Sequence, residues 1–432
     1  MKRIAIIGAG VSGLTTARLL TDSKRERREE EIVLFEKESK PGGLIRCERI
    51  GGSLFHTCGG HIFNTHDRQV HEWFWQHFNS EEEFLKADRN SVVFLPNGQH
   101  IPYPIENHAY MLNESLQRLF IHDLLQLDSA SAHPASQPGN FEDFLLQRFG
   151  KTLYDLYFGP YNRKLWQCSL KDVPLDWLKG KLPMPTREEI IYNNFNRVAE
   201  KQFVHSTFFY EKHGGSQFIA DRLAEGLDIR FNTDIKLIRH TGRQWILNGE
   251  VFDTVIFCGN IKDLPSLVQG VDVSAYTDFI DALSFHGTTT VFSEIDKTSY
   301  SWVYLPDESY RPHRIICTGN FSPTNDSGHI ALSERNGNVQ KTTATIEFTD
   351  YVSKEEILDG LKHTPLHPTY ITHKYNRYSY PIQDKNTREM IASLKELLSA
   401  KGFYFTGRFA DWEYYNMDAA MKAAMKTVER LC

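Results

Sequence analysis

The first thirteen residues constrain the fold more than any other part of the chain. Residues 4–7 form a short apolar run with the length of a buried parallel strand, and Gly8, Gly10 and Gly13 follow it. Glycine at these positions permits a tight turn, a close approach of backbone to a phosphate, and close packing of a helix on the strand. A helix over residues 12–20 would then direct free N–H groups at a pyrophosphate. A dinucleotide-binding βα unit is therefore predicted at the N-terminus.

The next strand and loop indicate which dinucleotide is bound. Residues 32–35 are apolar and end at Glu36, where a carboxylate would accept hydrogen bonds from the ribose hydroxyls of an adenosine. Gly42 and Gly43 come soon after, and two adjacent glycines let the chain pass closely over a flat ligand. Such a stretch is typical of flavoproteins of the amine oxidase and glutathione reductase type and is unusual in NAD enzymes. We therefore predict that the cofactor is FAD.

Residues near the C-terminal end are predicted to form a second set of contacts with the same cofactor. Arg408 follows Gly407 and is predicted to meet the FAD pyrophosphate. Asn416 is expected to be the N-cap of a helix that begins at Met417, and the N-terminus of that helix would stabilise an anionic reduced flavin near N1. The helix has an apolar stripe formed by Ala420, Ala424, Val428 and Leu431.

Composition and charge restrict the remaining possibilities. A chain of 432 residues, 41% of them hydrophobic, is long enough for two or three structural units with ample cores. The net charge of −6 argues against nucleic acid as a partner. The sequence has no apolar run near the roughly 18 residues that span a bilayer, and its N-terminus has the pattern of a strand rather than of a signal peptide. The six cysteines have no paired spacing, which predicts reduced thiols in a cytoplasmic protein.

The three histidines His56, His61 and His66 are five residues apart each time. This spacing places them on no common helix face, so no metal site is predicted. The middle of the chain shows two patterns. Helical periodicity dominates from about 106 to 200, around a low-complexity loop at 129–139, and period-two alternation predicts an antiparallel sheet in the segments 288–293, 301–305 and 314–319.

Short strands are expected at 203–209, 229–231, 245–247 and 255–257, where the chain would rejoin the cofactor domain. The predicted fold class is α/β, with a Rossmann-like, glutathione-reductase-like FAD-binding domain and inserted helical and antiparallel-sheet domains. The expected bounds are 1–65, 203–260 and 395–432 for the FAD-binding domain, 106–202 for the helical substrate domain, and 66–105 with 261–394 for the antiparallel-sheet substrate domain.

Several further motifs occur in an order that resembles a known family. They are GGHIFN at 59–64, IPYP at 101–104, PYNRKLW at 160–166, YLP at 304–306 with Arg314, and GRF at 407–409 with Tyr414. Together they resemble the UDP-galactopyranose mutases, and their spacing is closer to the eukaryotic-type mutases than to the usual bacterial ones. The resemblance runs almost from end to end and is weakest over about 186–212.

The resemblance implies an isomerase with unusual chemistry. Such enzymes interconvert the pyranose and furanose forms of UDP-galactose without net redox change, through a sugar adduct on N5 of the reduced flavin. Catalysis by the cofactor requires no side-chain nucleophile, and the sequence shows no convincing Ser/His/Asp or Cys/His set. NAD(P)H is a possible external reductant, and a UDP-sugar is the expected partner.

The resemblance also assigns residues to the substrate. Arg314 would bind the diphosphate as a fork donor, and the family's second diphosphate arginine falls on Lys181. The tyrosines that would surround the diphosphate and sugar are Tyr304, Tyr380 and Tyr414. Sugar-side positions fall on Asn162 and Trp166, and Phe321 stands where eukaryotic-type mutases carry another tyrosine.

At the base, Tyr103 would stack on the nucleotide, and Glu106 replaces the glutamine that reads uracil in the eukaryotic-type family. A carboxylate can accept the uracil N3–H and suits the cytosine amino group equally, so the base stays open; a solvated loop acid is the alternative for Glu106. His61 would lie close to the flavin ring and tune it. The residues expected to contact FAD are Gly8, Gly10, Val11, Ser12, Gly13, Glu36, Lys37, Gly43, Leu44, Gly60, His61, Ile235, Gly407, Arg408, Asn416, Met417 and Asp418.

Two other functions fit the same motifs. One is a redox enzyme of the amine oxidase or protoporphyrinogen oxidase type, although an oxidase for a hydrophobic substrate does not need cations such as Arg314 facing the flavin. The other is a flavin-free binding protein on the same scaffold, as in the Rab GDP-dissociation inhibitors, against which the intact glycine set with Glu36 argues. The hexose, the electron donor and the oligomeric state are left open by the sequence.

Overall fold

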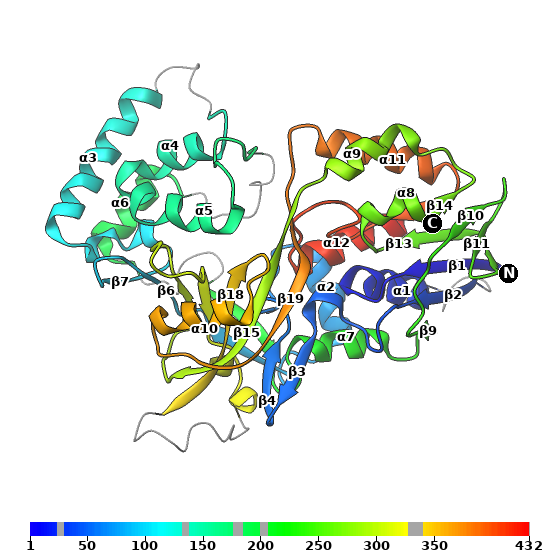
Figure 1. Ribbon diagram of the computed structural model, residues 1–432, viewed down its shortest axis with the longest axis horizontal. Helices are drawn as coiled ribbons and strands as arrows, with labels where there is room; N and C mark the ends of the chain where they lie inside the picture. The colour runs from blue at the N-terminus through cyan, green and yellow to red at the C-terminus, as the bar shows by residue number, and fades with distance from the viewer. Residues whose placement is uncertain (24–29, 132–137, 176–184, 199–205, 327–339, 432) are drawn as a thin grey trace.

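Both ends of the chain contribute to one parallel sheet. The computed structural model describes residues 1–23, 30–131, 138–175, 185–198, 206–326 and 340–431. Five strands lie in the order β20-β13-β1-β2-β9, and all neighbours are parallel (Figure 1). They are β1 (Lys2–Ile7), β2 (Glu30–Phe35), β9 (Ile229–Arg230), β13 (Thr254–Phe257) and β20 (Phe403–Phe405).

The two faces of this sheet are covered by different elements. Ile4 and Ile6 of β1 belong to a core shared with α1 (Val11–Ser23) and α12 (Met417–Glu429), which pack against each other. Ala5 points to the other core, which includes α11 (Thr387–Ser399) and a four-stranded sheet. Burial of a strand on both faces explains its continuous apolar run. The strands of the smaller sheet are β10 (Ile238–His240), β11 (Trp245–Leu247), β12 (Glu250–Phe252) and β14 (Val268–Gln269).

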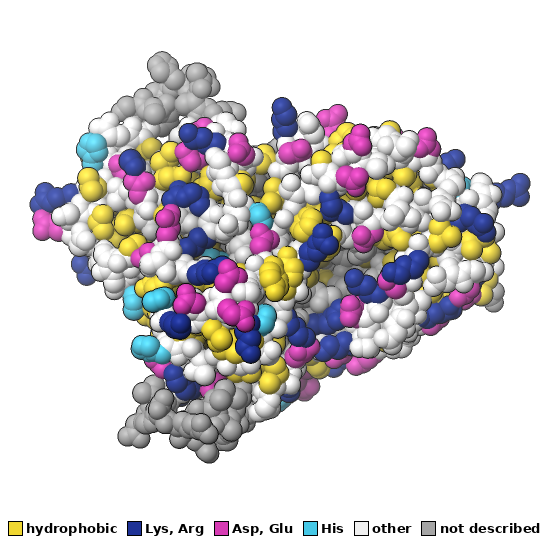
Figure 2. All heavy atoms as spheres, viewed as in Figure 1, with side chains coloured by type: hydrophobic (Ala, Val, Ile, Leu, Met, Phe, Trp, Pro, Cys, Tyr) yellow, Lys and Arg dark blue, Asp and Glu magenta, His cyan; other side chains and the backbone are white. Residues whose placement is uncertain are grey.

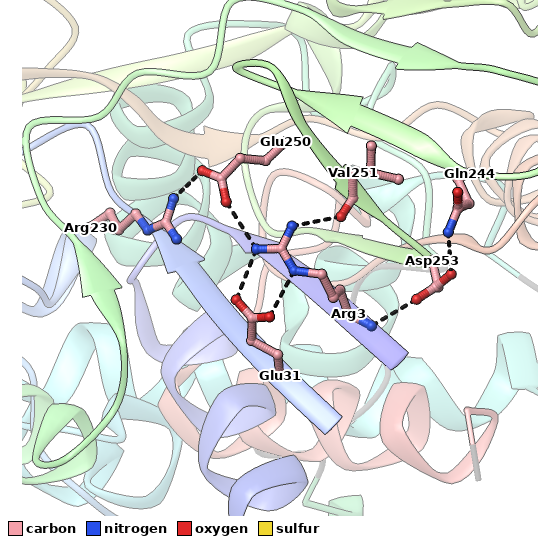
Figure 3. Close-up of polar contacts among 7 residues, drawn as sticks. All are labelled: Arg3, Glu31, Arg230, Gln244, Glu250, Val251 and Asp253. Carbon is pink, nitrogen blue, oxygen red and sulfur yellow. Dashed lines mark hydrogen bonds and ion pairs between the residues drawn. The ribbon is translucent and has the colours of Figure 1, made fainter. Parts of the chain in front are cut away.

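Figure 3 shows an ion-pair network that ties the two sheets together. The Arg3 guanidinium bridges Glu31 Oε2 at 2.8 Å and Glu250 Oε2 at 2.9 Å, and Arg230 contacts the same Glu250 carboxylate. The backbone N–H of Arg3 donates to Asp253 Oδ2 at 2.8 Å. Hydrogen bonds from Arg3 lower the pKa of Glu31, and bonds from Arg230 and Arg3 lower that of Glu250. Because these side chains are a quarter to a third exposed, each pair contributes modestly to stability.

A seven-stranded sheet forms the second layer, in the order β19-β15-β18-β17-β16-β6-β7. Each pairing is antiparallel except that of β6 with β16, so the predicted antiparallel sheet is present with one parallel pair. Its strands are β6 (Ser91–Phe94), β7 (His100–Pro102), β15 (Phe285–Asp296), β16 (Trp302–Tyr304), β17 (Arg314–Ile316), β18 (Lys341–Thr349) and β19 (Thr369–Pro381).

The register separates the two faces of this sheet by chemistry. Val303, Ile315 and Ile346 are paired neighbours, and they pack in one apolar cluster with α10 (Lys354–His363). The residues one position along, Tyr304, Arg314 and Glu347, are also paired neighbours and therefore share the opposite face.

The helical lobe lies beside the seven-stranded sheet, away from the parallel sheet (Figure 1). The region from about 106 to 200, where helical periodicity dominates, contains helices in its described parts, and a π-helical turn over Tyr154–Phe158 joins α4 to α5. The helices are α3 (Glu114–Ser131), α4 (Phe141–Leu153), α5 (Gly159–Trp166) and α6 (Arg187–Asn196). α4 starts where the Asn140 side chain accepts the N–H of Asp143, and α6 has a capping box between Thr186 and Glu189.

A strand was expected at 203–209, where the chain would rejoin the cofactor domain. The structure has β8 (Thr207–Glu211), which pairs antiparallel with β5 (Phe84–Asp88), and residues 203–205 lie outside the described residues. The other elements are the hairpin β3 (Cys47–Ile50) and β4 (Ser53–His56), with helices α2 (Arg68–His77), α7 (Ser216–Ala224), α8 (Leu264–Leu267) and α9 (Thr277–Ala282). Within the described ranges, every helix is too short or too polar to cross a membrane. Basic and acidic side chains are interspersed over the face shown in Figure 2.

Candidate functional site

One large cavity is bordered by residues of both the parallel sheet and the seven-stranded sheet. Its volume is about 1550 Å³, above the range of roughly 300–1,000 Å³ for pockets that hold one drug-sized ligand. Every residue predicted to contact the cofactor lines this cavity. So do four predicted substrate residues, Tyr304, Arg314, Tyr380 and Tyr414. The cavity therefore has room for a dinucleotide together with a second ligand.

The glycine turn after β1 has the geometry that a phosphate requires. Gly8 has a φ of +102°, and a Cβ added to Gly13 would lie 1.9 Å from the carbonyl oxygen of Gly8. A Cβ on Gly10, in contrast, would meet no protein atom within 4 Å. Gly8 and Gly13 therefore serve the turn and the helix packing, whereas Gly10 leaves space in the wall of the cavity for a ligand.

The acid at the end of β2 is held in place by the backbone. Glu36 accepts the N–H of Ala9 at 2.7 Å through one carboxylate oxygen and the N–H of Glu38 at 3.0 Å through the other. The side chain is buried yet lines the cavity. Since a carboxylate offers about four lone-pair positions, Glu36 retains acceptors for hydroxyl groups.

The C-terminal residues predicted to contact the cofactor also line the cavity. Asn416 occupies the N-cap position of α12, as predicted, but its side chain makes no capping hydrogen bond. It therefore leaves the N–H groups of the first turn uncovered by a cap, and that turn lines the cavity at Met417 and Asp418. The Arg408 guanidinium lies 4.2 Å from the ring centre of Tyr414, and its buried Nε has no hydrogen-bond partner within the described part of the chain. A buried N–H donor of this kind suits an anionic ligand.

Together these observations fit FAD. An open glycine position, an acceptor carboxylate, a helix N-terminus and an orphaned guanidinium N–H line one cavity, although they come from opposite ends of the chain. His61 lies on the same wall, and its buried Nε2 has no partner among the residues that the structure describes. Burial and the nearby Arg408 charge lower the pKa of His61 to about 4, so its ring is neutral at neutral pH.

The other end of the cavity is built around a buried ion pair. Arg314 Nε contacts Glu347 Oε2, and Arg314 Nη2 donates to the Tyr380 hydroxyl at 3.2 Å. Burial by itself would raise the pKa of Glu347, but the Arg314 charge and the contact with His313 lower it to about 2. Tyr380 stacks on Tyr414 with ring centres 5.5 Å apart. Arg314 is thus oriented by the protein and keeps N–H donors for a further anion.

Other predicted substrate residues lie apart from this cavity. Within the described ranges, its wall does not include Tyr103, Glu106, Asn162 or Trp166. Tyr103 packs 5.0 Å from the Tyr304 ring, and Asn162 donates to the Phe158 carbonyl at 2.7 Å. Trp166 is a buried residue of the lobe core. Lys181 lies outside the described residues. The roles assigned to these five residues remain predictions.

Glu106 is not a solvated loop acid, so that alternative was wrong. The side chain is 2% exposed, and burial raises its pKa to about 7. Its Oε2 has no hydrogen-bond partner among the described residues. Phe321 is also fully buried, against Trp302 and Tyr210.

Glu347 and Arg89 are among the charged residues of the wall that the sequence reasoning missed. Glu347 is the one acid in the strand Lys341–Thr349, on the face opposite the apolar cluster. The alternation of side chains along this strand was the sequence signal that could have indicated its face. Arg89 lies in the turn between β5 and β6, where it donates to the Tyr304 hydroxyl at 2.6 Å and approaches the Trp302 ring at 5.0 Å. The sequence around Arg89 carries no such signal.

The fold and the cavity together define a protein with a dinucleotide-binding domain, and residues 6–78 match the family model of an NAD(P)-binding Rossmann-like domain. Among curated relatives, the dTDP-fucopyranose mutase of Escherichia coli is 23% identical over 99% of this chain and 98% of its own length. A probable UDP-galactopyranose mutase of Klebsiella pneumoniae is 28% identical over 45% of this chain, and the match spans about half of that relative, 48%.

Two solved structures have a similar fold over the whole chain. A reduced UDP-galactopyranose mutase superimposes with a TM-score of 0.84 at 21% identity, covering 100% of this chain and 94% of that one. A putative protoporphyrinogen oxidase from Exiguobacterium sp. 255-15 reaches 0.72 at 15% identity, covering 100% and 98%. The predicted fold class and the predicted resemblance to the UDP-galactopyranose mutases are confirmed, and the relatives agree with the predicted isomerase.

Proposed function

We propose that this chain is a flavin-dependent mutase that interconverts the pyranose and furanose forms of a sugar carried on a nucleoside diphosphate. One observation carries the proposal. A single cavity joins a wall suited to FAD to the buried Arg314–Glu347 pair and the Tyr380–Tyr414 stack. Similarity to a dTDP-fucopyranose mutase over 99% of the chain supports it.

The chain's own residues would hold the cofactor at defined places. Glu36 would accept the ribose hydroxyls, Gly10 would admit the pyrophosphate, and Arg408 would pair with its charge. The N-terminus of α12 would favour negative charge on the reduced ring system. When bound, the reduced flavin supplies the nucleophile of the reaction, so the protein's task is binding and orientation.

The substrate end would bind the diphosphate. Arg314 would donate through the N–H groups that Glu347 and Tyr380 do not use, and the Tyr304 hydroxyl, held by Arg89, would add a second contact. The neutral ring of His61 would lie against the cofactor without adding charge. NAD(P)H as external reductant, cytoplasmic location, and the division into one cofactor domain and two substrate domains belong to the same proposal.

The test is to reduce the FAD-loaded protein and offer it UDP-, dTDP- and CDP-hexoses separately. The expected result is isomerised nucleotide sugar from at least one of them, with no reductant or oxygen consumed per turnover. Product is measured by chromatography and oxygen with an electrode. Stoichiometric consumption of oxygen or NAD(P)H with each turnover would overturn the mutase in favour of an oxidoreductase.

A further inference from the structure

Lys164 in α5 holds a loop of the seven-stranded sheet by its backbone. Its half-buried ammonium donates to the carbonyl oxygens of Leu305 at 2.8 Å and Pro312 at 3.4 Å, and more closely to those of Asp307 and Tyr310. An ammonium has three protons and no acceptor, so a cage of carbonyls satisfies it completely. Lys164 therefore joins a helix of the lobe to a loop distant in sequence.

The loop held in this way connects two residues of the cavity wall. Tyr304 ends β16 and Arg314 begins β17, and the two are paired across the ladder. Both line the cavity, whereas the loop between them, residues 305–313, does not. The loop is closed at its base by the N–H of Leu305, which donates to the His313 carbonyl at 2.9 Å. Because Tyr304 and Arg314 flank the loop, a change in the position of the loop would move both residues.

The backbone of the helix that carries Lys164 is fastened to the same sheet at the same end, in its last turn. The Thr349 hydroxyl donates to the Lys164 carbonyl at 2.8 Å, and a ring nitrogen of His286 bonds the Trp166 carbonyl at 2.7 Å. Tyr161, one turn earlier, packs edge-on against Tyr304 with ring centres 5.4 Å apart. α5 therefore packs against the strands that carry Tyr304 and Arg314, and the Lys164 ammonium holds the loop that joins those strands.

We propose that Lys164 is a positioning residue for the substrate: its ammonium fixes the 305–313 loop against α5 and thereby sets where Tyr304 and Arg314 stand in the cavity. The inference rests on the proposed function, because the ligand that these two residues would bind is a nucleoside diphosphate. Lys164 itself does not line the cavity and touches no reacting atom.

The chain contains a matched control. Lys262 donates to three carbonyl oxygens, those of Ile280, Asp281 and Leu283, each at 2.9 Å. It lies in the short helical turn Ile261–Asp263, next to Asp263 of the cavity wall, and belongs to neither of the strands that carry Tyr304 and Arg314. Replacing either lysine with methionine leaves a similar set of carbonyls without their donor, so both variants should lose stability.

The experiment titrates UDP into FAD-loaded wild type, Lys164→Met and Lys262→Met and follows the flavin fluorescence. We expect a UDP dissociation constant raised about tenfold in Lys164→Met, which corresponds to roughly 1.4 kcal/mol, with wild-type flavin content. Lys262→Met should melt earlier yet bind UDP as wild type does. Equal losses of melting temperature with wild-type UDP affinity in both variants would reduce Lys164 to a structural residue and overturn the inference.

A second variant covers the case in which Lys164→Met does not fold. Lys164→Arg keeps the charge, but a planar guanidinium does not fit a compact carbonyl cage made for an ammonium. It should hold flavin and bind UDP more weakly, and wild-type UDP affinity in this variant would overturn the inference. If wild type binds neither UDP nor dTDP nor CDP, the proposed function fails and the inference with it. Binding by wild type with no change in the Lys164 variants defeats the inference alone.

Discussion

One end of the cavity is formed mainly by backbone groups, and the other is formed mainly by side chains. The cofactor end consists mainly of backbone: a glycine turn, the first turn of α12, and an acid held by two N–H groups. The end proposed for the substrate consists of side chains from neighbouring strands, with Arg314 oriented by the buried Glu347. A backbone site follows from a local motif, whereas a side-chain site depends on strand register. The two ends should therefore respond differently to substitution.

The largest effect is expected at the ion pair. Arg314→Ala should weaken UDP binding by roughly 2–5 kcal/mol, because a desolvated donor is lost, while flavin content stays at the wild-type level. It should also lower the free energy of unfolding by about 3–5 kcal/mol, since Glu347 is left as a buried charge without its partner. Isothermal titration with UDP and chemical denaturation measure the two losses.

The control for this prediction is the double variant Arg314→Met, Glu347→Gln. Replacing both charges should restore most of the stability but none of the UDP affinity. If the double variant regained UDP binding, Arg314 would not be the diphosphate donor, and the proposed division between the two ends of the cavity would fail.

A slightly smaller effect is expected at Glu106, in the helical lobe. Its pKa is raised by burial to about 7 from an ordinary value of 4.5. The folded state then holds a proton that the unfolded chain has lost, so stability falls as the pH rises through this window. Relative to Glu106→Gln, wild type should lose up to about 3 kcal/mol between pH 4.5 and pH 8. Parallel stability curves for the two proteins from urea denaturation would contradict this.

At the cofactor end, Gly13→Ala should reduce stability by about 2 kcal/mol, because its Cβ would lie 1.9 Å from the Gly8 carbonyl oxygen and α1 must shift. Gly10→Ala is the matched change, since its Cβ would enter open space. The apoprotein of Gly10→Ala should melt close to the wild-type apoprotein yet hold FAD more weakly. Calorimetry and flavin absorbance of both variants would show whether the turn and the phosphate site are separable.

The smallest effect is expected far from the cavity, at the network of Figure 3. Arg3→Met should cost about 1 kcal/mol or less at neutral pH, because the pairs are partly exposed. The lowered pKa values of Glu31 and Glu250 mean that this contribution is present above about pH 4.5 and is lost as the pH falls and the carboxylates are protonated. The melting temperatures of the two proteins should therefore converge in acid, and a constant difference down to pH 3 would be inconsistent with the network.

The residues predicted to contact the cofactor all line one cavity, because the sequence signals that select them are local. The spacing of Gly8, Gly10 and Gly13 determines a turn within a few residues, and Asn416 as the expected N-cap placed the start of α12 at Met417. The alternation within β18 indicated only which face carries Glu347, and its pairing with Arg314 depends on the register between β17 and β18, which the sequence of one strand does not reveal. The pairing of β8 with β5 was not predicted, for the same reason.

The family resemblance predicted several substrate residues that the sequence patterns alone do not indicate. It placed Tyr304, Arg314, Tyr380 and Tyr414, which line the cavity, and also Asn162 and Trp166 in α5, which do not. The orientation of α5 is set by tertiary contacts such as the carbonyl cage of Lys164, and these are not visible in the order of motifs.

The meeting of both chain ends in one sheet has a consequence for biosynthesis. α1 packs on α12, and β13 lies between β1 and β20, so the cofactor cradle lacks a wall until residues 403–429 have left the ribosome. At about 5–20 residues per second, the glycine turn waits roughly 20–80 s for its counterpart. A nascent chain that stops early would keep its dinucleotide motif but could not retain the flavin, so a bound yellow cofactor reports that translation has passed α12.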